Sequence, residues 1–356
     1  MSRSDSPLSA YACISMPLAP SFLMTKILFF CIGVSFALAK VSVYSAVGLI
    51  TDGKKEHASF MNIVEGVFMV GALSGLWLFS AFIENDPKSQ TWLHVYWILA
   101  GLCAVNIFVL FTTSLDESGA HCEKPTTFAQ DFIGMLWLAK KLLVIVFIIS
   151  IFLYVLIEQG IQTWLPTFNK EILKLPSDMS VQAASIYAAC LAAGRLSAGG
   201  VLRRVHWYPF ICVCLLVMAG LVVVSMPMAT GIEENPNMSW FHAPAAAFIF
   251  PIIGLFMAPI YPAINSVMLS ALPKPQHSAM TGLIVIFSAL GGTTGSRITG
   301  YTFEHVDGQT AFYFSLIPMA IILIALYFFK RETEKLAVPD TTPRMQGLEP
   351  VPTGEV

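Results

Sequence analysis

Long apolar runs separated by short polar segments dominate the sequence. A helix needs about 20 apolar residues to cross a bilayer, and nine runs reach that length: 27–50, 59–83, 92–113, 142–165, 181–202, 208–229, 244–271, 279–302 and 311–330. Because lipid offers backbone groups no hydrogen-bond partners, each run is expected to be an α-helix. The pattern therefore predicts an all-α, polytopic membrane protein with about nine spans.

The longest polar separator divides the spans into three and six. This separator, 114–141, begins polar and then carries apolar residues at helical spacing, which predicts an amphipathic linker helix at the membrane surface. We expect an incomplete bundle at 26–113 and a six-helix bundle at 142–330. Residues 1–25 are interpreted as an N-terminal segment, the remnant of a further helix, and polar residues 331–356 as a disordered tail.

Basic residues are concentrated in alternate loops, including the pairs at 54–55, 140–141 and 203–204. Cytoplasmic loops of membrane proteins carry an excess of Lys and Arg. These loops are therefore expected to face the cytoplasm, with the C-terminus inside and the N-terminus outside. We expect a multi-pass protein of the plasma membrane, the inner membrane in a bacterium.

Composition supports the membrane class and excludes several others. Hydrophobic residues make up 56% of the chain and charged residues 12%, whereas soluble domains carry about 25% charged residues. The net charge of −2, without a basic stripe, argues against nucleic acid as a partner. The seven cysteines have neither disulfide nor zinc spacing. Without a catalytic or phosphate-binding motif, the chain is not expected to be an enzyme or to hold a cofactor or metal.

Polar residues inside the apolar runs are the candidates for function, because a charge at mid-membrane costs at least about 2.5–3.5 kcal/mol on insertion scales. Tyr154, Glu158 and Gln162 recur every four residues and so share one helix face. A carboxyl between an aromatic ring and an amide suits a polar solute. The alternative for Glu158 is a structural hydrogen bond to a neighbouring helix.

Three other spans carry candidates. Lys40 needs a partner or a water-filled cavity, and Glu65 in the next span is the nearest carboxylate in sequence. The pair is either a structural clamp or part of solute coupling. Asn265 follows two prolines, which bend or break a helix at the depth where transporters place sites, or form a simple packing kink. Arg195 lies deeper than the basic pair at 203–204 and is a candidate gating residue.

Four stretches, 62–69, 154–166, 194–204 and 258–262, resemble in order and spacing the major facilitator superfamily, and within it the fucose-permease-like sugar–proton symporters. The resemblance covers about 26–330. It implies two six-helix bundles joined by a long cytoplasmic loop. The nine spans then correspond to helices four to twelve, and three front helices are missing. Lys40 and Arg203 replace acidic residues of the family pattern.

Two hypotheses of function follow. The first is secondary active transport of a small polar solute, a sugar by resemblance, by alternating access and with a coupling proton or sodium ion. Glu158, Gln162 and Asn265 would line the cavity with Tyr154, and Trp164 would cap it. Lys40 and Glu65 would switch partners, and Arg195 would act as a gating residue. The alternative is a truncated, non-transporting membrane protein or assembly partner. The solute and the lipid bilayer are the expected partners, and the oligomeric state stays open.

Overall fold

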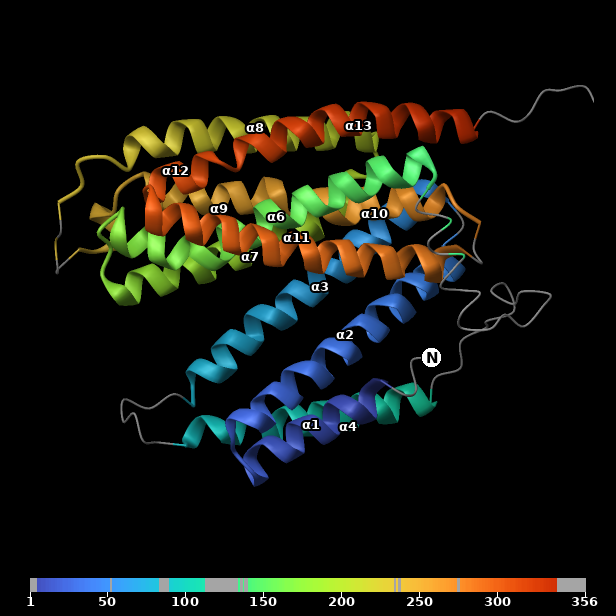
Figure 1. Ribbon diagram of the computed structural model, residues 1–356, viewed down its shortest axis with the longest axis horizontal. Helices are drawn as coiled ribbons and strands as arrows, with labels where there is room; N and C mark the ends of the chain where they lie inside the picture. The colour runs from blue at the N-terminus through green and yellow to red at the C-terminus, as the bar shows by residue number, and fades with distance from the viewer. Residues whose placement is uncertain are drawn as a thin grey trace, which may run out of the picture.

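The structure is a computed structural model that describes residues 5–51, 53–82, 90–112, 134, 137, 140–233, 235, 238–273 and 276–337. Within these ranges the chain is helical and contains no strand. Eight helices there are long and apolar enough to cross a membrane. A further long helix lies in the bundle beside them, so the predicted all-α membrane fold is confirmed (Figure 1).

The N-terminal part consists of α1 (Asp5–Leu18), α2 (Phe22–Ile50), α3 (Lys54–Ser80) and α4 (Val95–Thr112), with the short 3-10 turn Thr91–His94 before α4. The helix α2 begins where the hydroxyl of Ser21 accepts a hydrogen bond from the backbone N–H of Met24 at 3.1 Å, which satisfies one of the free donors of the first turn. The short α1 packs against α2 and α4. Few residues of its long helices are buried within the described structure.

The C-terminal bundle holds the hydrophobic core. Its helices are α6 (Leu142–Glu171), α7 (Ser177–Val201), α8 (Trp207–Met228), α9 (Ala246–Met257), α10 (Ile260–Ser270), α11 (His277–His305), α12 (Gly308–Tyr313) and α13 (Leu316–Ala337), and a 3-10 turn at Trp240–His242 precedes α9. The break between α9 and α10 falls at Pro259, whose ring cannot donate the backbone hydrogen bond of a continuous helix. Together α9 and α10 form one span, bent where the sequence predicts.

Three segments bear on the expected boundaries. The segment 1–25 contains α1 and the first turn of α2. The helix α13 continues to Ala337, so the residues 331–337 are helical where a disordered tail was expected, because the last turns of the span extend beyond the apolar run. The predicted linker helix at 114–141 lies almost wholly outside the described residues, as does the tail after Ala337.

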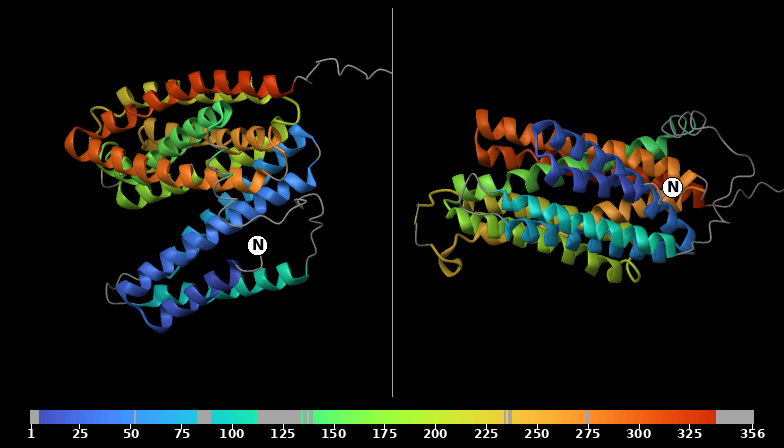
Figure 2. Two further views of the ribbon diagram at one scale, coloured as in Figure 1. Left: turned by 45° about the vertical axis from the view of Figure 1, so that its right-hand side comes forward. Right: turned by 90° about the horizontal axis from the view of Figure 1, so that it is seen from below.

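The N-terminal part meets the bundle through α2 and α3. The helix α3 packs against α7 and α10, and α2 packs against α11. Figures 1 and 2 show that α2 and α3 approach the bundle at the end where α2 finishes and α3 begins, and diverge from it toward the other end. We name the end where α2 finishes and α3 begins the closed end, and the opposite end the open end. Burial along α3 follows the same course, since Ala58, Met61 and Glu65 are buried whereas Val67 and Trp77 are exposed.

Close packing and hydrogen bonds, among them one from Arg203 Nε to the Ser59 hydroxyl at 2.9 Å, hold the closed end. Gly48 of α2 lies against the ring of His277 of α11, and a Cβ at this position would overlap the ring nitrogen Nδ1. His57 Nδ1 of α3 lies 2.6 Å from the hydroxyl of Ser266 of α10. Both histidines and Ser266 are buried. The closed end is therefore a fitted contact of four helices.

Candidate functional site

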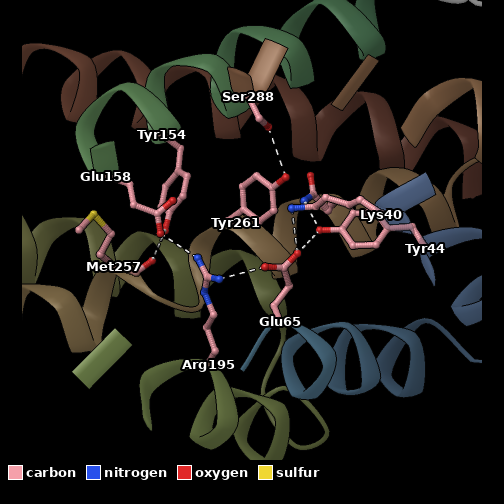
Figure 3. Close-up of polar contacts among 10 residues, drawn as sticks. Lys40, Tyr44, Glu65, Tyr154, Glu158, Arg195, Met257, Tyr261 and Ser288 are labelled. Atoms are coloured by element: carbon pink, nitrogen blue, oxygen red, sulfur yellow. Dashed lines mark hydrogen bonds and ion pairs between the residues drawn. The ribbon is translucent and has the colours of Figure 1, made fainter. Parts of the chain in front are cut away.

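Four charged side chains form a chain of ion pairs across the boundary between the two parts of the molecule (Figure 3). Lys40 Nζ of α2 lies 3.1 Å from Glu65 Oε1 of α3. Arg195 of α7 donates from Nη1 to Glu65 Oε2 at 2.9 Å and from Nη2 to Glu158 Oε1 of α6 at 2.8 Å. We call these four residues the charge network. Its two cations and two anions sum to zero.

The charge network lies inside the protein. The exposed side-chain fractions are 15% for Lys40, 5% for Glu65, 4% for Arg195 and 9% for Glu158. Removing one partner of a buried ion pair typically costs about 3–5 kcal/mol, because the other charge remains buried without compensation. A planar guanidinium can bind two carboxylates at once. Arg195 therefore holds α3 and α6 together through α7.

Helical spacing brings tyrosines to the same place. Tyr44 lies one turn after Lys40 on α2, and its hydroxyl donates to Glu65 Oε1. Tyr154 lies one turn before Glu158 on α6. Its hydroxyl is 3.1 Å from both Glu158 Oε1 and the carbonyl oxygen of Met257. Met257 is the last residue of α9, so the break before α10 is tied to the charge network.

The helix α10 contributes an aromatic ring and an amide. The ring centre of Tyr261 lies 4.7 Å from Lys40 Nζ, within cation–π range, and its hydroxyl is 3.3 Å from Ser288 Oγ of α11. Asn265 Nδ2 lies 3.5 Å from the Tyr44 hydroxyl. Within the described structure Asn265 Oδ1 is buried without a hydrogen-bond partner. A polar ligand or water that reached this point would find a free acceptor.

The structure joins six of the eight predicted site residues. Lys40, Glu65, Tyr154, Glu158, Arg195 and Asn265 meet around the charge network. Gln162, one turn beyond Glu158, is half-buried. Trp164 Nε1 donates to the carbonyl oxygen of Ser296 at 2.9 Å, and its ring stacks on Phe303. In this conformation Trp164 thus packs α6 on α11.

Sequence reasoning missed two residues of this site. Tyr44 lies four residues after Lys40, a spacing that places both on one helix face. This spacing was available in the sequence. Tyr261 lies between the two prolines of the helix break. Its approach to Lys40 depends on the packing of α10 beside α2 and α3, which no local pattern reveals.

In this conformation the four residues of the charge network bind one another. One cavity of about 320 Å³ at the closed end is lined by residues that include Lys55, Trp207 and Lys330. Another, of about 690 Å³, lies near the start of α12 and is lined by residues that include Lys174 and Asp307. Neither cavity contains a residue of the charge network. A ligand that binds Lys40 or Arg195 competes with the carboxylates that already pair with them.

The fold matches solved structures of membrane transporters at low sequence identity. FucP, a fucose–proton symporter of E. coli, in its outward conformation gives a TM-score of 0.73 at 13% identity over 92% of this chain and 82% of its own. The proton–xylose symporter XylE gives 0.70 at 12% over 93% and 79%. The human organic anion transporter MFSD10 gives 0.71 at 14% over 91% and 76%. These likenesses concern the fold.

The fold and its buried charges thus define a polytopic helical membrane protein. The sequence model of the Major Facilitator Superfamily matches residues 7–292 and 238–353. The chain belongs to this superfamily, and the predicted family is confirmed. A search of curated proteins found no match.

Proposed function

We propose that the protein is a secondary active transporter that moves a small polar solute by rocking α2 and α3 against the C-terminal bundle. The observation that supports this most directly is the ion pair between Glu65 and Arg195, which joins the N-terminal part to the C-terminal bundle inside the charge network. A buried ion pair contributes little net stability compared with apolar packing. An ion pair at a boundary that moves is therefore better explained by a role in movement, in which its charged groups change partners, than by a role in stability.

Arg195 is the centre of this proposed change. It is shared between Glu65 on the N-terminal side and Glu158 within its own bundle. When α3 moves away from α7, the bond between Glu65 and Arg195 breaks. Glu65 keeps Lys40 and Arg195 keeps Glu158, and each lacks one of its contacts until new ones form. A solute, water or a coupling ion can supply them, so binding and movement are linked through differential contacts. We assign partner switching to Lys40, Glu65 and Arg195, and solute contact to Tyr154, Glu158 and Asn265.

We further propose that the closed end faces the cytoplasm. The basic pairs at 54–55 and 203–204 lie at this end, in agreement with the excess of Lys and Arg in cytoplasmic loops. The C-terminus would then be inside. A solute would enter from the open end, as in an outward-facing transporter, and FucP is described in such an outward conformation.

The first solute class to test is a sugar taken up with a proton, because FucP and XylE are sugar–proton symporters. The full chain is reconstituted in liposomes, and uptake of monosaccharides and their carboxylated derivatives is measured with and without a pH gradient. We expect saturable uptake that the gradient accelerates. Folded protein that takes up no solute would contradict the proposal and support a non-transporting membrane protein.

The substitution Glu158→Gln tests the carboxylate within the site. It keeps the shape and removes the charge that pairs with Arg195, so we expect uptake to fall by about tenfold or more, the effect of losing one charge-assisted contact. The matched control is Glu304→Gln, because Glu304 is exposed at the far end of α11. Unchanged uptake and pH dependence in Glu158→Gln would show that this carboxylate has no part in transport.

A further inference from the structure

The most exposed member of the charge network is Lys40, a cation at one end of the chain of ion pairs. The side chain of Lys40 is 15% exposed, whereas those of Glu65, Arg195 and Glu158 are 4–9% exposed. Phe36, one turn nearer the open end of α2, is exposed as well. A solute that approaches from the open end therefore meets an ammonium before it meets a carboxylate.

Lys40 is also the partner that the charge network can release at least cost. Glu65 is its one ion-pair partner in the described part of the chain. Glu65 itself has two further partners, because Arg195 donates to Oε2 and Tyr44 donates to Oε1. If Lys40 leaves, Glu65 keeps a guanidinium and a phenol. If Arg195 leaves, Glu158 loses its cation as well.

The surroundings of Lys40 suit a carboxylate that takes the place of Glu65. Three aromatic rings lie within cation–π range of Lys40 Nζ, at 5.7 Å for Phe36, 5.3 Å for Tyr44 and 4.7 Å for Tyr261. They hold the ammonium in place without neutralising it. A hydroxyl group of a neutral solute cannot replace the charge of Glu65. A carboxylate can, and the rings give it an apolar wall on each side.

The total charge of the site determines what must accompany such an anion. The charge network sums to zero, so a bound anion alone would leave one uncompensated negative charge among buried groups, which is strongly unfavourable. A single proton on a carboxylate removes this charge. Glu65 is the carboxylate that gives up Lys40, so it is the acceptor.

The titratable groups around Glu65 come from α2, α6, α7 and α10. The titratable side chains near it are Lys40 and Tyr44 from α2, Arg195 from α7, Glu158 of α6 on the far side of Arg195, and Tyr261 from α10. Of these groups only the two carboxylates change charge by accepting a proton. Glu158 keeps its bond to Arg195 when Lys40 is released.

We propose that the solute is a small organic anion whose carboxylate binds the ammonium of Lys40 between the rings of Tyr44 and Tyr261 (Figure 3). It crosses together with one proton carried by Glu65, so that no net charge moves. This inference rests on the proposed function and narrows its solute class to carboxylates, including hydroxylated ones such as sugar acids.

The first test compares matched solutes. Liposomes with the full chain are given glucuronate or glucose, galacturonate or galactose, and glycerate or glycerol. We expect at least one anion to enter about tenfold faster than the uncharged solute matched to it, which is the effect of one charge-paired contact. Uptake of neutral members alone would overturn the anion assignment and leave the transport function intact. Uptake of no member by folded protein would overturn both.

The second test measures charge movement. A potassium gradient with valinomycin sets an inside-negative potential, and a pH gradient is imposed separately. We expect acid outside to accelerate uptake of the anion, and the potential to change the rate by less than about twofold, because the potential acts only on net charge. Slower uptake at negative potential would mean that the bare anion crosses, and faster uptake that extra cations accompany it. Either result overturns the one-proton stoichiometry.

The third test separates solute binding from structural support. Lys40→Arg keeps the cation and should retain the preference for the anion, whereas Lys40→Gln should lower the ratio of anion uptake to neutral uptake by about tenfold. A purely structural lysine would lower both rates together and leave the ratio unchanged, which would overturn the assignment. The control is Lys26→Gln on the same helix, because Lys26 is exposed and lies outside the charge network.

Discussion

The boundary between α2–α3 and the C-terminal bundle is held differently at mid-span and at the closed end. At mid-span, Glu65 and Arg195 are charged partners that a solute or a proton can replace. At the closed end, His57 Nδ1 lies 2.6 Å from the Ser266 hydroxyl, Arg203 Nε donates to the Ser59 hydroxyl at 2.9 Å, and Gly48 fits against His277 by shape. On the proposed function, the mid-span ion pair responds to ligands, while the closed end is held by shape and by hydrogen bonds.

Arg195→Gln should have the largest effect on this comparison. The substitution removes the cation that Glu65 and Glu158 share, and leaves Glu158 without a cationic partner. We expect loss of uptake and a destabilisation of about 3–5 kcal/mol, the usual cost of a buried charge left unpaired. Thermal unfolding in detergent and uptake in liposomes are the two measurements.

Arg195→Lys and Arg204→Gln complete this experiment. A lysine keeps the charge but lacks the planar fork that binds two carboxylates at once, so its stability should lie between those of the parent and Arg195→Gln. Arg204 is exposed at the closed end, and its substitution should leave both stability and uptake near the parent values. Equal stability of Arg195→Gln and Arg204→Gln would show that the charge network does not hold the helices together.

The same comparison shows what the sequence could predict. The long helices follow from apolar runs, because a bilayer leaves an apolar segment few alternatives to a spanning helix. The pairing of Lys40 with Glu65 followed from their positions in adjacent spans. The break at Pro259 followed from the missing backbone donor.

The rest of the site depends on tertiary packing. Arg195 reaches Glu65 only because α7 lies between α3 and α9. Small residues such as Gly194 and Gly199 permit this approach: a Cβ at Gly194 would overlap the carbonyl of Leu255, and one at Gly199 would crowd the carbonyl of Ser59. The sequence showed small residues there, but it did not show which helices they would admit. The contact of His57 with Ser266 went unpredicted for the same reason.

Gly48→Ala should have an intermediate effect, confined to the closed end. The added methyl group would overlap the ring of His277, which is buried and held by the Leu272 carbonyl at 3.0 Å from Nε2. Overpacking of this kind typically costs about 1–3 kcal/mol. We expect α2 and α11 to separate at the closed end, measured as a longer distance between spin labels placed there.

Two further variants test whether the longer distance comes from the overlap with His277. Gly33 lies on the same helix, and no neighbouring atom is within 4 Å of a Cβ added there. Gly33→Ala should therefore leave the distance between the spin labels unchanged. Adding His277→Ala to Gly48→Ala should restore the short distance, since the smaller side chain makes room. If Gly48→Ala and Gly33→Ala gave the same distance distribution, the closed end would not be held by shape.

The smallest effect should come from Tyr261→Phe, which asks whether the ring or the hydroxyl of Tyr261 matters at mid-span. The hydroxyl lies 3.3 Å from Ser288 Oγ and also interacts with Lys40 and Tyr44, whereas the ring covers Lys40. Phenylalanine keeps the ring, so we expect uptake within about threefold of the parent, an effect smaller than the loss of an average hydrogen bond of roughly 1 kcal/mol.

Tyr261→Leu removes the ring and should lower uptake further, by up to about 2 kcal/mol for the loss of a desolvated cation–π contact. Equal losses in both variants would assign the role to the hydroxyl, and the ammonium of Lys40 would then be positioned by hydrogen bonding rather than by the aromatic rings.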